Sequence, residues 1–344
     1  MEKERAKNEL PDDLTVLKKR FVHAALDPAA SEERARGLAD SLTDQGSWPD
    51  VDYETRQRSS WPTPAHLGRL KMMAVAWRDP KSPAHGDRHL LRAAVRALEH
   101  WLEKDYQNPN WWWNQIGVPG QMADILLLLQ PELSTAQLSR GIGILERAEP
   151  AMTGQNLVWL TLITARRGIL EGDRELVTES FQRIRRQIRI TEEEGIQADF
   201  SFHQHGPCLY NHGYGASFAR SCSRIAGILR GTQMAFSQEE IDVLTRLVLD
   251  GSRWMTRNGW ADFGASGRGI TRQGPNSCQY LAGVAKNMRE LPTGREEEFK
   301  DLLSRMESGQ PDLSGNRHFW RSDFMTHHRD SYYVSARMYS QRIV

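Results

Sequence analysis

The stretch DRHLLRAAVRALEHWLEKDY, residues 87–106, decides the fold class. Its apolar residues recur at the i, i+3/i+4, i+7 spacing of one helix face, with charges between them; they are Leu91, Ala94, Val95, Leu98, Trp101 and Leu102. Similar patterns occur at about 12–28, 32–44, 64–78, 116–129, 135–149, 156–170, 174–190, 214–230, 238–254 and 294–307. Start and stop signals such as SPAHGD, LSTAQ and QPELS separate them. The sequence therefore predicts an all-α protein.

The connections between these helices are short, which favours antiparallel hairpins stacked side by side. No strict repeat is present, so a uniform solenoid is not expected. A single curved or toroidal array of helical hairpins fits this pattern better. Strand signals occur only in DSYYVSARMYSQRIV, residues 330–344.

Composition narrows the class of protein. The 344 residues are 39% hydrophobic and 26% charged, which is typical of a globular chain. The net charge of +1 excludes a globally basic nucleic-acid binder. No apolar run reaches transmembrane length, and the opening MEKERAKNEL lacks the apolar stretch of a signal peptide. The three cysteines have no metal-binding spacing, so neither a zinc site nor a disulfide framework is expected.

The segment HQHGPCLYNHGYG, residues 203–215, holds three histidines, two tyrosines and three glycines. Imidazole and phenol groups are often recruited for proton transfer. His205 and Tyr214 lie nine residues apart across an irregular stretch, so a loop has to bring their side chains together. Gly213 and Gly215 keep the backbone beside Tyr214 slim, which we expect to let a substrate approach. The alternative is a buried tyrosine hydrogen-bonded to a histidine.

Three further features add candidate residues. Arg268 and Arg272, in SGRGITR, form a possible clamp for a carboxylate or sulfate, and their charge suits a phenol that must act as a base. The residues Trp111, Trp112 and Trp113 point in different directions on a helix, so we expect at least one ring to leave the core. That ring could stack on a sugar, or the three could form an aromatic plug. Asn156, taken by itself, is expected to be an ordinary cap at the start of a helix.

Five blocks, taken in order, resemble those of the polysaccharide lyase 8 enzymes that cut chondroitin and hyaluronan, the chondroitin AC lyases above all. The blocks are NWWWNQIGVP, TGQNLVW, DFSFHQHGPCLYNHGYG, GRGITR and HHRDSYYVSARMYSQR, and they run from about residue 108 to the end. The resemblance implies an incomplete α/α toroid, expected over residues 1–325, with the start of a β region over 326–344 and, in full-length members, large β domains. One departure is Phe200, which stands where the family has glycine.

The resemblance also implies a role for each matching residue. Tyr214 would remove the C5 proton of a uronic acid and then protonate the leaving oxygen. His205 and Asn156 would bind the uronate carboxylate, while Arg268 and Arg272 would lower the pKa of the tyrosine and hold substrate. The expected substrate contacts are Trp111, Trp112, Trp113 and Gln204.

The implied partner is an acidic polysaccharide, with a β domain as a possible further part, and with no nucleic acid, membrane, metal or cofactor. The implied location is secreted or periplasmic. Two alternatives stay open: a glycoside hydrolase that uses paired carboxylates such as Asp199 and Asp262, and a sugar-binding toroid without activity. The sequence does not separate chondroitin from hyaluronan, or endo from exo cleavage.

Overall fold

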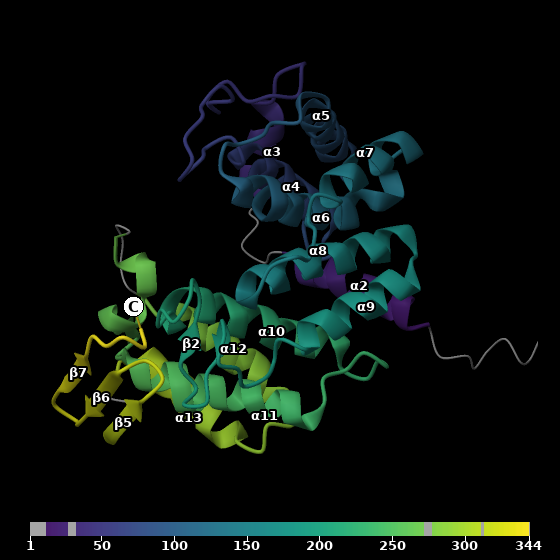
Figure 1. Cartoon of the computed structure of the whole chain (residues 1–344). Helices are drawn as coiled ribbons and strands as arrows, with labels where there is room; N and C mark the ends of the chain where they lie inside the picture. Colours follow the sequence, from purple (N-terminus) through teal and green to yellow (C-terminus); the bar gives the residue numbers. More distant parts are fainter. Residues whose placement is uncertain (1–11, 27–31, 272–276, 311–312, 344) are drawn as a thin grey trace, which may run out of the picture. The chain divides into compact units, whose positions relative to one another are not determined.

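The computed structural model describes residues 12–26, 32–271, 277–310 and 313–343. Twelve α-helices lie in these ranges, with a few short strands, and this confirms the predicted all-α class (Figure 1). The chain divides into two compact units. The first contains residues 1–150 and 159–180, and the second contains residues 151–158 and 181–344.

The first unit is built from helices whose caps follow the expected signals. Asp87 accepts hydrogen bonds from the backbone N–H groups of His89 and Leu90 at the start of α5, and Ser134 forms a capping box with Gln137 at the start of α7. The helices in this part of the chain are α2 (Asp13–Ala25), α3 (Glu32–Asp40), α4 (Ala65–Arg78), α5 (Arg88–Lys104), α6 (Val118–Leu129), α7 (Thr135–Leu145), α8 (Gly154–Glu171) and α9 (Arg174–Arg185).

The buried face of α5 differs slightly from the predicted one. Leu91 and Val95 are only half-buried, whereas Leu90, Ala93 and Ala97 are buried. The observed buried face of α5 is therefore rotated by about one residue from the predicted face, a shift within the width of an apolar helix face. Alanines line much of it and allow close packing against α4 and α3.

Helix α6 is the central element of the first unit. A π-helical turn, η1 (Trp113–Gly117), leads into it, and a 3₁₀ turn, η2 (Gln130–Glu132), follows it. Nearly every side chain of α6 is buried, because α2, α4 and α7 all pack against it.

The second unit joins helices to short hairpins and a small sheet. Its elements are β1 (Gly195–Ile196), β2 (Phe202–His203), η3 (Asn211–Gly215), α10 (Ala216–Leu229), α11 (Gln238–Arg246), η4 (Leu247–Gly251), η5 (Ser252–Met255), β3 (Thr256–Arg257), β4 (Trp260–Ala261), η6 (Phe263–Ala265), η7 (Gly267–Thr271), α12 (Gln279–Arg289) and α13 (Glu296–Ser308). The helix predicted over 238–254 ends at Arg246 and continues as π and 3₁₀ turns. Helix α12 was not predicted.

The last residues form an antiparallel sheet in the order β5 (Gly315–Phe319), β6 (Phe324–His328) and β7 (Tyr333–Arg337), yellow in Figure 1. Only β7 lies in the stretch predicted to hold strands. The sheet begins at Gly315, before the residue 326 at which the β region was expected to start.

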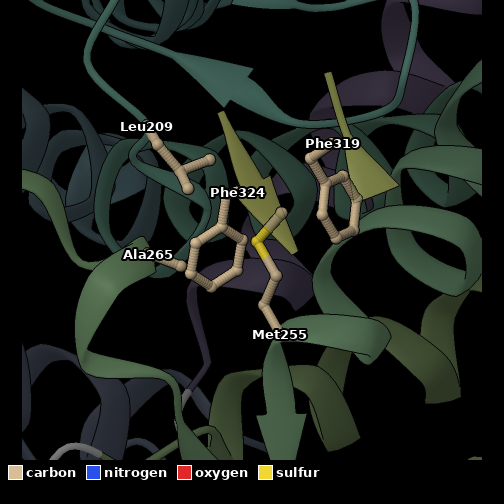
Figure 2. Close-up of a cluster of buried hydrophobic side chains, with 5 residues drawn as sticks. All are labelled: Leu209, Met255, Ala265, Phe319 and Phe324. Atoms are coloured by element: carbon tan, nitrogen blue, oxygen red, sulfur yellow. The ribbon is translucent and has the colours of Figure 1, made fainter. Parts of the chain in front are cut away.

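A hydrophobic cluster attaches this sheet to the helical part of the second unit. Leu209, Met255 and Ala265 gather around Phe324 of β6, and Phe319 of β5 completes the group (Figure 2). All five side chains are buried. Leu209 and Ala265 belong to the irregular segments that carry the candidate site, so the sheet buttresses those segments directly.

Candidate active site

The segment from β2 to α10 carries the first two candidate residues. β2 pairs with β1, and the chain folds back so that the backbone N–H of Tyr210 donates to the carbonyl of Phe202 at 2.8 Å. His205 lies in the turn between them with a positive φ of 63°. Tyr214 lies in the following π-helical turn, η3. An irregular connection therefore joins the two, as predicted.

The two side chains meet. The ring centroids of His205 and Tyr214 lie 4.8 Å apart, with the ring planes perpendicular. Tyr210 packs behind them, its ring 5.2 Å from that of Tyr214. Tyr210 is buried, Tyr214 is half-buried and His205 is exposed, so His205 and Tyr214 are accessible from solvent.

Arg268, from η7, completes this group and sets the charge state of the histidine. Its Nη2 donates a hydrogen bond to Nε2 of His205. A guanidinium has no acceptor, so Nε2 carries no proton and the imidazole is neutral, with its proton on Nδ1. Burial and the adjacent Arg268 lower the pKa of His205, while the Glu194 carboxylate opposes them. We call His205, Tyr214 and Arg268 the site cluster.

Two glycines hold the segments of the site cluster together. A Cβ at Gly213 would lie 2.2 Å from the ring of Tyr210, and one at Gly267, where φ is +50°, would lie 2.5 Å from it. The ring of Tyr210 thus fits against both backbones. The space beside Gly213 is filled by protein, so the expectation that this glycine opens a path for substrate was wrong.

The other two histidines of the segment are structural. Nε2 of His212 donates to the carbonyl of Met255 at 2.8 Å, and its Nδ1 accepts from the Tyr280 hydroxyl at 3.0 Å. His203 is buried and donates through Nε2 to the Ser322 hydroxyl at 2.8 Å. Burial lowers the pKa of each to about 4. They anchor the segment, and His205 alone of the three is exposed at the site cluster.

Asn156 lies in the first turn of α8, in the second unit. The residue is 6% exposed, and its Oδ1 is buried without a hydrogen-bond partner among the described residues. A buried acceptor left unpaired costs about 1–3 kcal/mol. A hydrogen bond donated by a ligand hydroxyl to this Oδ1 would remove that cost.

Gln204, a predicted substrate contact, is buried and bonded at both ends of its amide. Its Oε1 accepts from the backbone N–H of Gln155 at 3.0 Å, and its Nε2 donates to Glu194. Gly154 makes this approach possible, because a Cβ there would lie 2.3 Å from Oε1 of Gln204. A contact with substrate would require Gln204 to exchange partners, and that role stays a prediction. Arg272 lies outside the described residues.

The three consecutive tryptophans belong to the first unit. Trp111 is 41% exposed, which confirms that one ring leaves the core. Trp112 and Trp113 are half-buried and lie edge to face at 5.1 Å, with Trp159 and Trp61 against them. Gly117 leaves room for both rings, since a Cβ there would meet each within 3 Å. Their role in sugar binding stays a prediction.

The paired carboxylates of the hydrolase alternative are both buried and bonded. Asp199 accepts from the Ser201 hydroxyl at 2.6 Å and from the backbone N–H of Arg321 at 2.6 Å. Asp262 accepts from the Tyr333 hydroxyl at 2.6 Å and from the backbone of Gly264. Each holds the local fold together, so neither is placed to act as an acid or nucleophile.

Phe200 shows why a glycine suits its position. Its φ is 65°, in the left-handed region that costs a residue with a Cβ roughly 1–2 kcal/mol. The ring is buried beneath the Arg246 guanidinium, which lies 4.0 Å from its centroid. Such a cation–π contact contributes about 0.5–2 kcal/mol and offsets part of the strain.

Glu194 and Tyr210 take part in the arrangement and were not predicted from the sequence. Glu194 sits in the run TEEEGI, which has the composition of a solvated surface turn. Within the described ranges, no group of three or more His, Cys, Asp or Glu side chains is arranged to hold a metal ion. None of the helices described is both long and apolar enough to cross a membrane.

Comparison with known proteins agrees with the resemblance. Residues 22–307 match the N-terminal alpha-helical domain of polysaccharide lyase family 8, and residues 314–344 match the super-sandwich domain of the same family. Chondroitinase-AC of Pedobacter heparinus is 28% identical over 313 residues, 88% of this chain and 44% of the relative. Hyaluronate lyase of Thermasporomyces composti is 28% identical over 236 residues, 66% of this chain and 30% of the relative.

A solved chondroitinase AC lyase, described in complex with oligosaccharides, superimposes with a TM-score of 0.90 at 25% identity. The match covers 96% of this chain and 51% of that one. The chain thus spans about half or less of the length of these three relatives.

Proposed function

The chain belongs to polysaccharide lyase family 8, and from this premise we propose that it cleaves uronic-acid-containing glycosaminoglycans by β-elimination, with Tyr214 as general base and then general acid. The observation that carries the proposal is the site cluster: a tyrosine ring 4.8 Å from a neutral imidazole that is hydrogen-bonded to an arginine. The substrate would be chondroitin, hyaluronan or both. A location outside the cytoplasm, secreted or periplasmic, goes with this proposal.

The reaction needs a base that can take a weakly acidic proton. The C5 proton of a uronate lies next to a carboxylate, so its removal places a second negative charge beside the first. Donors aimed at the carboxylate stabilise that charge, and loss of one such donor typically costs about 10²–10³ in rate. In our proposal, the Nδ1–H of His205 and the side-chain amide of Asn156 are these donors.

The proton then returns to the departing sugar. The Tyr214 phenolate takes the C5 proton, a double bond forms between C4 and C5, and the bond from C4 to the glycosidic oxygen breaks. The Tyr214 hydroxyl gives the proton to that oxygen, which restores the phenolate. A phenol in water has a pKa of about 10, so the phenolate needs positive charge nearby, and Arg268 supplies it.

The test compares Tyr214→Phe with Tyr210→Phe. Both substitutions keep the ring and remove one hydroxyl, but only Tyr214 is proposed to move the proton. We expect Tyr214→Phe to lower kcat by roughly 10²–10⁴ with little change in oligosaccharide affinity, while Tyr210→Phe retains most of its turnover. The assay follows the ultraviolet absorbance of unsaturated uronate on chondroitin and hyaluronan.

Three outcomes would count against the proposal. Full activity of Tyr214→Phe would remove this residue from the reaction. New reducing ends without ultraviolet absorbance would indicate hydrolysis. Binding of uronate polymers by the unaltered protein without any cleavage would favour the sugar-binding alternative.

A further inference from the structure

The carboxylate of Glu194 receives three hydrogen bonds from two separate segments of the second unit. Its Oε2 accepts from the Thr153 hydroxyl at 2.6 Å and from Nε2 of Gln204. Its Oε1 accepts from the backbone N–H of Gly206 at 3.0 Å. Both oxygens are therefore engaged, and the side chain is held in one place.

These two segments carry the two residues expected to bind the uronate carboxylate. Thr153 directly precedes α8, whose first turn contains Asn156. Gln204 and Gly206 stand on either side of His205. Gln204 adds a parallel link, because its Oε1 accepts from the N–H of Gln155. Glu194 and Gln204 together tie the start of α8 to the turn that presents His205.

A direct contact between Glu194 and substrate does not fit this geometry. A carboxylate would repel an anionic polymer, and both of its oxygens already accept hydrogen bonds from the protein. The half-buried carboxylate instead faces the two backbones that it connects. Its contribution must therefore act through the residues it holds.

We propose that Glu194 is a positioning residue, which fixes the distance between Asn156 and His205 so that both can bind one carboxylate of the substrate. This inference rests on the proposed function. Among the residues that the structure describes, Arg268, Glu194 and the rings of Tyr210 and Tyr214 face His205. Glu194 is the anionic member of that set, and it opposes the effect of Arg268 on the pKa of His205.

The first experiment substitutes Glu194→Gln, with Glu193→Gln as the matched control. Glu193 is the exposed neighbour, and its substitution makes the same change in net charge. A glutamine at position 194 offers one acceptor, which cannot serve Thr153, Gln204 and Gly206 together. We expect kcat to fall roughly 10²-fold with a smaller change in KM, because the misplaced donors matter most in the transition state.

A second readout does not depend on activity. Loss of the negative charge at position 194 should lower the pKa of His205, followed by NMR of its imidazole, whereas Glu193→Gln should leave it unchanged. The N–H of Gly206 should also exchange faster with solvent in Glu194→Gln. The shift in the pKa of His205 reports the lost charge, so positioning itself is judged by the split between kcat and KM and by the exchange of the Gly206 N–H.

The decisive variant exchanges the two side chains, Glu194→Gln with Gln204→Glu. The amide now at position 194 can donate to Thr153 and to the carboxylate now at position 204, and it can accept from Gly206. That carboxylate in turn accepts from the N–H of Gln155, so every link has a partner again. We expect this double variant to restore the slow solvent exchange of the Gly206 N–H that the single variant loses, a readout that does not depend on the predicted contact of Gln204 with substrate. The proposal is overturned if Glu194→Gln matches Glu193→Gln in kcat and in the exchange rate of the Gly206 N–H, or if the double variant does not restore that exchange rate.

Failure of the proposed function would look different. If the unaltered protein forms no unsaturated product, the lyase assignment fails. The positioning role is then judged by the exchange rate of the Gly206 N–H and by the affinity of the three variants for uronate oligosaccharides.

Discussion

The hydrophobic cluster around Phe324 makes a prediction that links stability to the site. Phe324 is 1% exposed and packs with Leu209, Met255, Ala265 and Phe319 (Figure 2). Phe324→Ala would remove the ring on which the other four side chains converge. We expect the second unit to lose stability and the site cluster to lose order at the same time.

The magnitude follows from the burial. A fully buried phenylalanine truncated to alanine typically costs about 3–5 kcal/mol, including the cavity left behind. The whole free energy of unfolding of a domain of ordinary size is only about 5–15 kcal/mol. With about 2–4 °C per kcal/mol for a domain of some 150–250 residues, the melting temperature should fall by roughly 6–20 °C.

Phe324→Ala should also lower the activity of the site, because two members of the hydrophobic cluster lie close in sequence to catalytic candidates. Leu209 lies in the segment between His205 and Tyr214, and Ala265 lies three residues before Arg268. Loosening of this packing should therefore lower kcat/KM at temperatures below the unfolding transition. A displacement of about 1 Å in a reacting group can cost roughly 10²-fold.

The assay is differential scanning calorimetry, which can separate the transitions of two units, together with initial rates at 25 °C or below. Met325→Ala is the matched control, because Met325 is the next residue on β6 and is 40% exposed on the opposite face of the sheet. Its substitution should stay within about 0.5 kcal/mol of the unaltered protein. Equal shifts for Phe324→Ala and Met325→Ala would refute the idea that this cluster anchors the site.

Two further predictions concern titration. Arg268→Ala should raise the pKa of His205, because it removes the cation that helps to lower it; NMR titration of the imidazole checks this, and a lowered pKa would contradict it. Burial lowers the pKa of His66 from 6.5 to about 4. Between pH 6.5 and pH 4, the imidazole of His66 therefore binds a proton more readily in the unfolded state than in the folded state. Stability that His66 contributes above pH 6.5 should be lost as the pH falls toward 4, by up to about 1.4 kcal/mol per pH unit. Urea titrations should show a smaller loss of stability between about pH 7 and 4.5 for His66→Gln; an unaltered dependence on pH would count against the assignment.

Much of the helical architecture could be predicted from local pattern. Helix α5 was expected within residues 87–106 and runs from Arg88 to Lys104. Helix α12 was missed, although Leu281, Val284, Ala285 and Met288 have the same spacing. The short hairpins β1–β2 and β3–β4 had no detectable signal, because two-residue strands carry no alternation to read.

The candidate site was predictable in its residue types and less so in its partners. His205 and Tyr214 were expected to meet across a loop, and they do. His203 and His212 have the same side chain as His205, yet both are engaged in hydrogen bonds within the protein and anchor the segment. Residue type states what chemistry a side chain can do; its burial depends on what packs against it.

The sequence by itself determined the helical class, most helix ends and the identity of the proton-transfer candidates, because these depend on residues within a few positions of one another. Only the tertiary structure decided that Glu194 joins Thr153 to Gly206, that Tyr210 fits against Gly213 and Gly267, and that Phe324 supports both irregular segments. Apart from the contact of Tyr210 with Gly213, these contacts join residues twelve or more positions apart, and no local pattern encodes them. Hydrogen bonds and packing act over a few ångströms in space, whatever the separation in sequence.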